Sequence, residues 1–229
     1  MDAARERGTL TFSSDGAQHL PAALDTAALD QVRAALAMLP LGRAGLRLHG
    51  IAALHPLLAP SGPVGAAAAT VLGPAAQPVR AILFNKTAAA NWALPWHQDR
   101  TIAVQARIDT PGFGPWTCKD GLLHVAPPAA LQAGMATLRL HLDPVPPGNA
   151  PLLIAPGSHR LGRIPEAEVP TVVRRCGVAT CLAGAGDIWL YATPILHAST
   201  AAVTPGHRRV LQVDYTAADL PGGLCWLGV

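Results

Sequence analysis

A histidine and an aspartate one residue apart, followed much later by another histidine, are the side chains of this sequence best suited to hold a metal ion. His97 and Asp99 lie in the segment PWHQD, and His197 lies in ATPILHAST. On an extended chain both residues of a His-x-Asp pair leave the same face, so they present an imidazole and a carboxylate together. Two histidines and one carboxylate form the facial triad of non-haem iron(II) oxygenases, which leaves positions open for a cosubstrate and oxygen. The sequence therefore predicts an iron site at these three residues.

A second His-x-Asp pair competes for this assignment. His141 and Asp143 lie in LRLHLDPVPPGN, where Asp143 runs directly into a turn of Pro and Gly. An aspartate at such a position is expected to cap the turn, so we expect the metal at the earlier pair. His159 follows a Gly-Ser turn and is expected to hydrogen-bond locally, whereas His124 is placed to face the site from a long loop. The histidines without any pattern are interpreted as structural or solvated: His19, His49, His55 and His207.

An arginine near the second histidine is suited to bind a carboxylate. Arg208 comes eleven residues after His197, just past the Thr-Pro-Gly turn of VTPGHRRV. A hairpin there would return Arg208 to the metal strand, and its planar guanidinium matches the distal carboxylate of 2-oxoglutarate. Arg209 alternates with it and is expected to face the other way. By itself either arginine would be interpreted as a surface residue; the combination with His197 favours an anchor.

The elements that must position these residues are mostly short strands. Pro and Gly number 22 each and are spread along the chain, which is typical of strands joined by tight turns. Apolar spacing predicts a helix over Asp25–Met38, ended by Pro40, and two shorter helices at Ala52–Leu58 and Pro63–Leu72. Strands are predicted at Val79–Phe84, Thr101–Ile108, Met135–Leu142, Leu152–Ala155, Val178–Leu182, Ile188–Tyr191 and Arg209–Tyr215.

This order of elements predicts a single domain over residues 1–229. A largely helical N-terminal part (1–78) precedes a body of strands (79–229), which indicates a mainly β fold with flanking helices, a jelly roll. Residues 110–134 are rich in Pro and Gly and show little periodicity. A loop of this length in a compact domain is usually a lid or a binding loop, so we expect one at this place.

Composition excludes several classes of partner. The 229 residues are half apolar and 14% charged, with a net charge of +3 and scattered basic residues, so no nucleic acid is expected. Four cysteines are too few and too irregular for a disulfide framework or a zinc ribbon. The opening residues MDAARERG lack an apolar signal region, and no stretch is long enough to span a membrane. The expected location is therefore the cytoplasm, and the sequence does not indicate an oligomeric state.

Taken in order, the motifs resemble the phytanoyl-CoA dioxygenase-like family of iron(II)/2-oxoglutarate oxygenases. The resemblance runs from about Val79 to Tyr215 and is carried by FNKTAAANWALPWHQD, LRLHLD, NAPLLIAPGSHRLG, AGDIWLYATPILHAST and HRRVLQVDY. It implies a cupin-like double-stranded β-helix with iron(II) bound by His97, Asp99 and His197. It also implies that Arg208 anchors 2-oxoglutarate.

Three further cosubstrate contacts are implied by positions that relatives use. They are Asn85, Lys86 and Ser199, which have alternative interpretations as a turn residue, a solvated cation and a strand-end hydroxyl. Ala150 stands where relatives commonly have Gly, which is expected to alter that turn. Asp99 is retained, whereas halogenating relatives replace this carboxylate with a small residue. The resemblance therefore implies hydroxylation of a small molecule with O2, releasing succinate and CO2.

The substrate itself is not implied. Side chains near the metal motif and the proposed lid are predicted to line a substrate pocket, with buried packing as the alternative. They are Gln98, Trp96, Trp92, Arg100 and Trp116, together with Phe113 and Lys119. Two other functions remain open: a cupin-like metalloenzyme that does not use 2-oxoglutarate, and a non-catalytic jelly-roll binding protein. Arg208 argues against the first, and the intact triad argues against the second.

Overall fold

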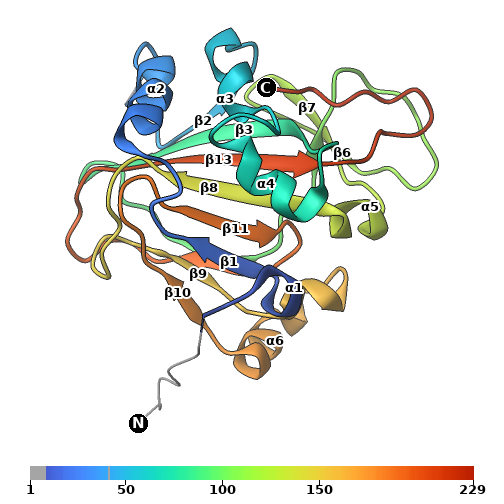
Figure 1. Cartoon of the computed structure of the whole chain (residues 1–229). Coiled ribbons are helices and arrows are strands. Elements are labelled where there is room, and N and C mark those ends of the chain that lie inside the picture. Colours follow the sequence, from blue (N-terminus) through green and yellow to red (C-terminus); the bar gives the residue numbers. More distant parts are fainter. Residues whose placement is uncertain (1–8, 41) are drawn as a thin grey trace.

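The computed structural model describes residues 9–40 and 42–229, which form three antiparallel sheets with helices outside them (Figure 1). The largest sheet has six strands in the order β1-β11-β8-β13-β3-β2. In that order they are Ala17–Leu20, Ile188–Ala192, Met135–His141, Arg208–Thr216, Gln77–Lys86 and Gly45–Leu48. The second sheet has the order β10-β9-β12-β4. Its strands are Ala179–Cys181, Leu152–Ile154, His197–Ser199 and Leu94–His97.

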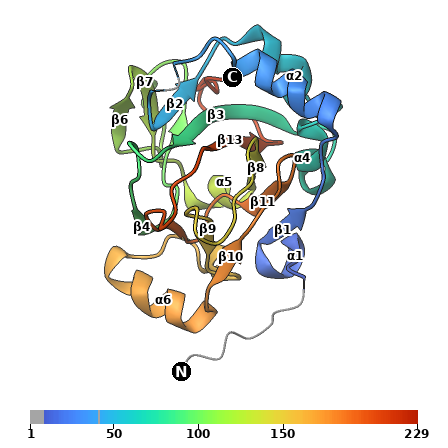
Figure 2. The same cartoon turned by 90° about the vertical axis from the view of Figure 1, so that its left-hand side faces the viewer.

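These two sheets are the halves of a jelly roll. In Figure 2 the large sheet curves over β4, β9 and β10, and residues from both sheets line a common interior. Neighbouring strands come from distant parts of the chain, since β13 lies between β8 and β3. A small third sheet has the order β5-β7-β6. Its strands are Ile102–Ala103, Leu122–Val125 and Trp116–Lys119.

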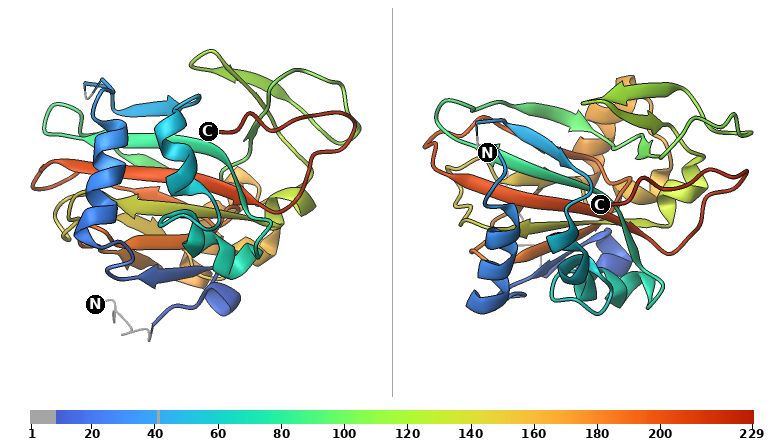
Figure 3. Two further views of the ribbon diagram at one scale, coloured as in Figure 1. Left: turned by 45° about the horizontal axis from the view of Figure 1, so that its top comes forward. Right: turned by 90° about the horizontal axis from the view of Figure 1, so that it is seen from above.

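Helices of the N-terminal part cover the outer face of the large sheet (Figure 3). They are α2 (Thr26–Leu36), η1 (Ala52–Leu54), α3 (His55–Leu58) and α4 (Gly65–Leu72). Helix α2 begins where the Asp25 carboxylate accepts a hydrogen bond from the Ala28 backbone N–H at 2.8 Å. One face of α2 then buries apolar side chains against the sheet. The residues of this contact region include Leu29, Val32, Leu36, Leu138 and Leu140.

Strand β8 is buried on both faces, and the two faces differ in chemistry. Leu138 and Leu140 belong to the core under the helices. Arg139 and His141 alternate with them, so they project into the interior of the jelly roll. Along the neighbouring strands β13 and β3, side chains that face the helices and side chains that face the interior alternate in the same way. The hydrophobic core therefore determines which polar side chains line the interior.

The remaining helices lie near the ends of the interior. They are α1 (Phe12–Asp15), α5 (Ala129–Ala133), η2 (Ser158–Leu161), η3 (Glu166–Glu168) and α6 (Val169–Cys176). Helix α6 packs beside β4, with Val169 and Val172 in a small core around Leu196. None of the helices in the described residues has the length and apolar character that crossing a membrane requires.

Most predicted elements are found. The helix expected over Asp25–Met38 is α2, and the seven expected strands correspond to β3, β5, β8, β9, β10, β11 and β13. The strand expected over Thr101–Ile108 is reduced to the two residues of β5. The N-terminal part is not only helical, because β1 and β2 pair with β11 and β3 at the two edges of the large sheet.

The segment 110–134 is largely folded rather than an irregular loop. It contains β6, β7 and α5, and β6 pairs with β7 as a hairpin. The two residues that connect these strands, Asp120 and Gly121, have φ angles of +51° and +78°. Positive φ at both positions of an Asp-Gly pair is the signature of a tight hairpin turn. This turn signal was present in the sequence and contradicts the loop interpretation.

Candidate metal centre

The two histidines of the predicted triad lie opposite each other in the four-stranded sheet. Strand β4 ends at His97 and β12 begins at His197, and the two residues are partners in the antiparallel register. Their ring centroids lie 4.3 Å apart. Pairing of two short strands from distant parts of the chain thus places both imidazoles together.

Backbone carbonyl groups orient both rings. Nδ1 of His97 donates to the Pro95 carbonyl at 2.8 Å, and Nδ1 of His197 donates to the Ile195 carbonyl at 3.0 Å. Because a carbonyl oxygen only accepts, the proton of each neutral ring is on Nδ1, and Nε2 keeps its lone pair for a metal. Burial lowers the pKa of His197 to about 4. This ring is therefore neutral, as a metal ligand must be, at neutral pH.

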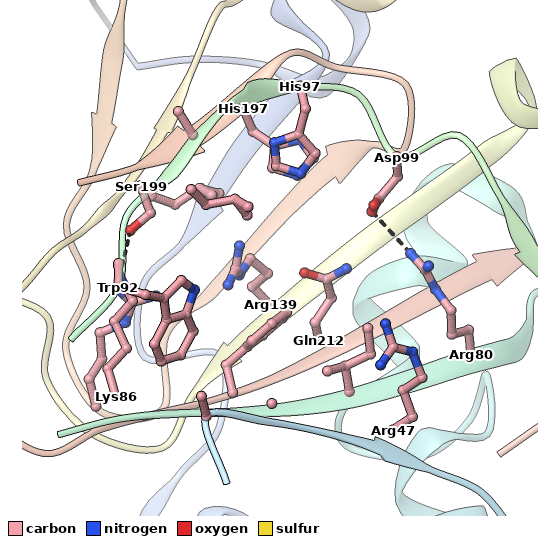
Figure 4. A pocket seen from close by; sticks show the side chains of 18 of the residues that line it. Arg47, Arg80, Lys86, Trp92, His97, Asp99, Arg139, His197, Ser199 and Gln212 are labelled. Atoms are coloured by element: carbon pink, nitrogen blue, oxygen red, sulfur yellow. Dashed lines mark hydrogen bonds and ion pairs between the residues drawn. The ribbon is translucent and has the colours of Figure 1, made fainter. Parts of the chain in front are cut away.

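Asp99 follows β4 in a loop rather than lying on the strand, yet its carboxylate is close to the two rings (Figure 4). Its Oδ2 accepts a hydrogen bond from Nη2 of Arg80 at 3.0 Å. Burial opposes ionisation of Asp99, but the charges of Arg80 and the two histidines outweigh it and lower its pKa. Nε of Arg80 also donates to Oδ2 of Asp214 at 2.6 Å. Arg80 therefore ties Asp99 to the large sheet.

The three side chains meet the requirements of a metal site. Their ligand atoms all lie within 4.8 Å of one another. Neutral imidazole nitrogens and a carboxylate oxygen are the donor set of mononuclear iron(II) sites that keep open positions. Among residues 9–40 and 42–229, no other group of three or more His, Cys, Asp or Glu side chains is close enough to hold a metal ion.

The second His-x-Asp pair has other partners. Asp143 does not cap its turn as expected; it accepts hydrogen bonds from Arg209 through the backbone N, Nε and Nη2, at 2.8, 2.9 and 2.7 Å. This happens because the start of β13 lies beside the end of β8. His141 is buried in the interior, where desolvation and then the charges of Arg139 and Arg208 lower its pKa to about 3. His141 therefore lies in the interior, whereas Asp143 lies beyond the end of β8 and is bound by Arg209.

Two other histidines also differ from their expected surroundings. His124 is fully buried in β7, where its Nδ1 donates to the Leu122 carbonyl at 2.9 Å, and it does not line the cavities at the metal residues. Nδ1 of His159 has no hydrogen-bond partner among the described residues. Its ring instead packs on Gly16, where an added Cβ would lie 2.1 Å from Nδ1. Neither residue belongs to the metal site.

A cavity of about 380 Å³ extends from the metal residues between the two sheets. Arg208, Ser199 and Lys86, which were expected to contact the cosubstrate, all line it. Nζ of Lys86 lies 3.1 Å from Oγ of Ser199, and Arg208 and Ser199 both donate to the carbonyl of Ala150. Arg208 does not return beside β12 through a hairpin, because β13 pairs with β3 and β8. It reaches the cavity from the opposite sheet.

Asn85 and Ala150 are neighbours of these residues that do not line the cavity. Asn85 does not line the cavity, because it alternates with Phe84 and Lys86 along β3 and faces the other side of the sheet. Ala150 has a φ of +50°, in the left-handed region that favours glycine. The turn therefore keeps a glycine-like backbone although it carries Ala, and its carbonyl remains the shared acceptor for Arg208 and Ser199.

A second cavity of about 1000 Å³ adjoins the metal residues between β4, β6 and α6. Trp96 and Arg100 line it, as the sequence predicted for substrate contacts. Gln98 also borders it, but its amide is engaged in the loop around it: it donates to the carbonyls of Pro194 and Gly162 at 2.7 and 2.9 Å and accepts from the Ile164 backbone N at 2.9 Å. Gln98 thus stabilises the surrounding backbone through its amide group.

The other two tryptophans lie elsewhere. Trp92 lines the first cavity rather than the second, with Nζ of Lys86 4.7 Å from the centroid of its ring. Trp116 lines neither cavity, because its ring packs with the cluster that contains Val125 and Trp226. The prediction that Trp116 contacts substrate is therefore not supported by its position.

The first cavity contains four further basic residues, of which only Lys119 was expected from the sequence. They project from alternate positions of β3 and β8 and from the strands β2 and β6 that border the opening: Arg80, Arg139, Arg47 and Lys119. With Lys86 and Arg208 they make six basic side chains against the single lining carboxylate of Asp99. The signal that could have revealed Arg80 and Arg139 is a single arginine within an otherwise mostly apolar strand, at a position that alternates with buried apolar residues.

Comparisons with known proteins agree with this architecture. Residues 12–210 match the model of the phytanoyl-CoA dioxygenase (PhyH) family. No curated protein has a significantly similar sequence.

Solved structures share the fold at low sequence identity. HygX from Streptomyces hygroscopicus, solved with nickel and 2-oxoglutarate bound, has a TM-score of 0.60 and 16% identity, over 90% of this chain and 84% of its own. EctD from S. alaskensis, in its apoform, has a TM-score of 0.62 and 18% identity, over 90% of this chain and 74% of its own. SnoN, a non-haem α-ketoglutarate-dependent epimerase from nogalamycin biosynthesis, has a TM-score of 0.61 and 17% identity, over 93% of this chain and 87% of its own. These likenesses establish the jelly-roll fold.

Proposed function

The chain belongs to the phytanoyl-CoA dioxygenase family, and from that premise we propose which of its residues carry the chemistry of an iron(II)- and 2-oxoglutarate-dependent dioxygenase. His97, Asp99 and His197 bind the iron. Iron(II) at this position supplies the activation of dioxygen, coupled to oxidative decarboxylation of 2-oxoglutarate to succinate and CO2. The observation that carries this assignment is that the triad and the carboxylate-binding Arg208 line one cavity.

The first cavity is the cosubstrate site in this proposal. The guanidinium of Arg208 binds the distal carboxylate of 2-oxoglutarate, because it is buried and has no carboxylate partner among the described residues. Ser199 and Lys86 lie beside it and supply a hydroxyl and an ammonium donor. Burial, followed by the charges of Arg208 and Arg139, lowers the pKa of Lys86 to about 8, so a bound dianion restores the preference of this amine for its charged form.

The second cavity is the substrate site. It shares His97 and Asp99 with the first cavity, so a molecule bound there approaches the metal from the side opposite Arg208. Its volume of about 1000 Å³ is at the upper end of small-molecule pockets. Trp96 offers an apolar surface, and Lys119 offers an ammonium group near the metal. We propose hydroxylation of a small molecule; epimerisation, the reaction of SnoN, is the alternative outcome.

We also propose that the enzyme works in the cytoplasm. Cys118, Cys181 and Cys225 are free thiols, as is usual in a reducing compartment. Burial raises the pKa of the Cys181 thiol, so this side chain is an inert part of the core.

An anaerobic titration tests the function. Iron(II) and then 2-oxoglutarate are added to the purified protein, and a visible charge-transfer band is expected only when both are present. His97→Ala and Asp99→Ala should lose stoichiometric iron, whereas the matched His141→Ala should retain it. Iron binding without binding of 2-oxoglutarate would favour the cupin-like metalloenzyme. Failure to bind iron would favour a non-catalytic protein.

A further inference from the structure

Three buried side chains on the inner faces of β8 and β13 have nitrogen atoms without hydrogen-bond partners. They are Arg139 (Nε), Arg208 (Nε) and His141 (both ring nitrogens), each no more than 6% exposed. Buried nitrogen donors are nearly always satisfied in folded proteins, by protein groups, water or a ligand. Of the three, Arg139 and Arg208 line the first cavity. Unsatisfied guanidinium donors that face a cavity indicate a strong bound acceptor.

Arg139 packs against an aromatic ring and forms no ion pair with any of the described carboxylates. Its guanidinium lies over the ring of Phe84, with Cζ 5.1 Å from the centroid. The nearby ion pairs belong to other arginines: Arg80 pairs with two aspartates inside the cavity, and Arg209 pairs with Asp143 on the other face of β13. In the described part of the chain no carboxylate lies within ion-pair distance of Arg139. An isolated buried cation is costly, so this side chain needs an anion from outside.

The position of Arg139 identifies the anion that fits. Arg139 lines the first cavity together with Arg208 but does not line the second. In Figure 4 its side chain lies below His97 and His197, between Trp92 and Gln212. Arg139 is thus on the metal side of the cosubstrate cavity, and Arg208 lies farther along the strand pair, beyond His141.

We propose that Arg139 is a second carboxylate-binding residue of the cosubstrate site, which binds the carboxylate of the 2-oxo acid that lies next to the metal. This proposal rests on the proposed function, because it takes 2-oxoglutarate as the occupant of the first cavity. A 2-oxo dicarboxylate has two anionic ends, and the cavity has two buried arginines without a carboxylate partner among the described residues, one for each end. A carboxylate of the substrate would instead be expected to approach from the second cavity, which Arg139 does not line.

Calorimetric titration of the nickel-loaded protein with two acids tests the proposal. Nickel binds similar donor sets without turnover. 2-Oxoglutarate carries both carboxylates, whereas pyruvate carries only the one next to the keto group. Arg208→Ala should weaken 2-oxoglutarate but leave pyruvate unchanged. Arg139→Gln should weaken both acids by a similar factor, about 10- to 100-fold. Arg139→Lys, which keeps the charge but not the planar fork, should lose less.

Controls separate this role from packing. Near-ultraviolet circular dichroism and the affinity for nickel alone should be unchanged in both Arg139 variants. If Arg139→Gln fails to fold, a three- to tenfold loss of pyruvate affinity in Arg139→Lys would still support the proposal, and an unchanged affinity would overturn it. Wild-type pyruvate binding in Arg139→Gln would overturn it and leave the cosubstrate site intact. Absence of metal-dependent 2-oxoglutarate binding in the wild type would instead reject the proposed function.

Discussion

The two ends of the cosubstrate cavity differ in whether their buried positive charges have carboxylate partners. At the metal end, Arg80 lies between Asp99 and Asp214, with N–O distances of 3.0 and 2.6 Å. What we call the unpaired end runs from Arg139 on the metal side to Lys86 and Arg208. In the described residues these three cations have no carboxylate within ion-pair distance. Their donors meet carbonyl and hydroxyl oxygens or remain unsatisfied. The first end is complete without a ligand. The positive charges of the second end are compensated only when an anion binds.

This difference separates positioning from binding. A guanidinium held by two carboxylates is fixed, so Arg80 holds the metal ligand Asp99 in one orientation. Three neighbouring cations repel one another, and burial together with that repulsion lowers the pKa values of Lys86 and Arg208. This repulsion lowers the stability of the ligand-free protein. A bound dianion relieves the repulsion, and this relief strengthens binding of the dianion.

The largest effect is expected from breaking the paired end. Arg80→Met leaves Asp214 buried beside Asp99 without a cation, and loss of one partner of a buried ion pair costs about 3–5 kcal/mol of unfolding free energy. Urea denaturation of the metal-free protein measures it. Asp214→Asn in the same background should recover part of the loss. Arg208→Met, the matched change at the unpaired end, should cost much less, because it removes repulsion; equal losses for the two arginines would contradict the comparison.

A smaller effect is expected when the unpaired end is filled. At a concentration 100 times its Kd, 2-oxoglutarate should stabilise the nickel-loaded protein by about 2.7 kcal/mol. Arg208→Ala weakens binding by at least about 30-fold, so at the same concentration the gain should fall below about 1 kcal/mol. The measurement is the shift of the urea midpoint on adding 2-oxoglutarate. A full shift in Arg208→Ala would show that the dianion does not use this arginine.

A fall in pH should lower the stability of the folded protein through His141, whose side chain is neutral when folded. Burial lowers the pKa of His141 to about 3, against about 6.5 in an unfolded chain. Between these values the unfolded chain binds a proton that the folded protein does not. Stability therefore falls as the pH drops from about 6.5 toward 3, by up to about 1.4 kcal/mol per unit for this residue. His141→Gln should reduce that slope in the metal-free protein, as urea denaturation at pH 6 and 4.5 will measure; an unchanged slope would mean that His141 is protonated when folded.

The part of the site that could be predicted from the sequence is the part fixed by local spacing. His97 and Asp99 are one residue apart, so any compact path of the chain keeps them close. His197 and Arg208 were assigned from their side-chain types and from their order after the first pair, and the resemblance to a family supported both. The hairpin expected to bring Arg208 beside the metal strand does not form. The long strands β3, β8 and β13 were recognisable because apolar residues dominate them.

What could not be predicted depends on sheet order. Arg80 and Arg139 lie on strands separated in sequence by almost fifty residues, and they meet in one cavity because β13 pairs with both strands. A period-two pattern shows that such residues share a face, but it does not show whether that face is a solvated surface or the inside of a barrel. The same ambiguity affected Asp143, whose partner Arg209 comes from the neighbouring strand, and Asn85, which faces away from the cavity.

The smallest effect is expected from Arg209, next to Arg208 but on the opposite face of β13. Its side chain forms a two-point ion pair with Asp143 that is partly exposed, and such pairs contribute about 1 kcal/mol or less. Arg209→Ala should lower the unfolding free energy by about that amount, while the affinity for 2-oxoglutarate stays at the wild-type value. Calorimetry and urea denaturation on the same variant separate the two quantities. If Arg209→Ala weakened 2-oxoglutarate as much as Arg208→Ala does, the alternation of faces along β13 would not explain the site, and a general positive charge would have to replace two directed arginines as the basis of binding.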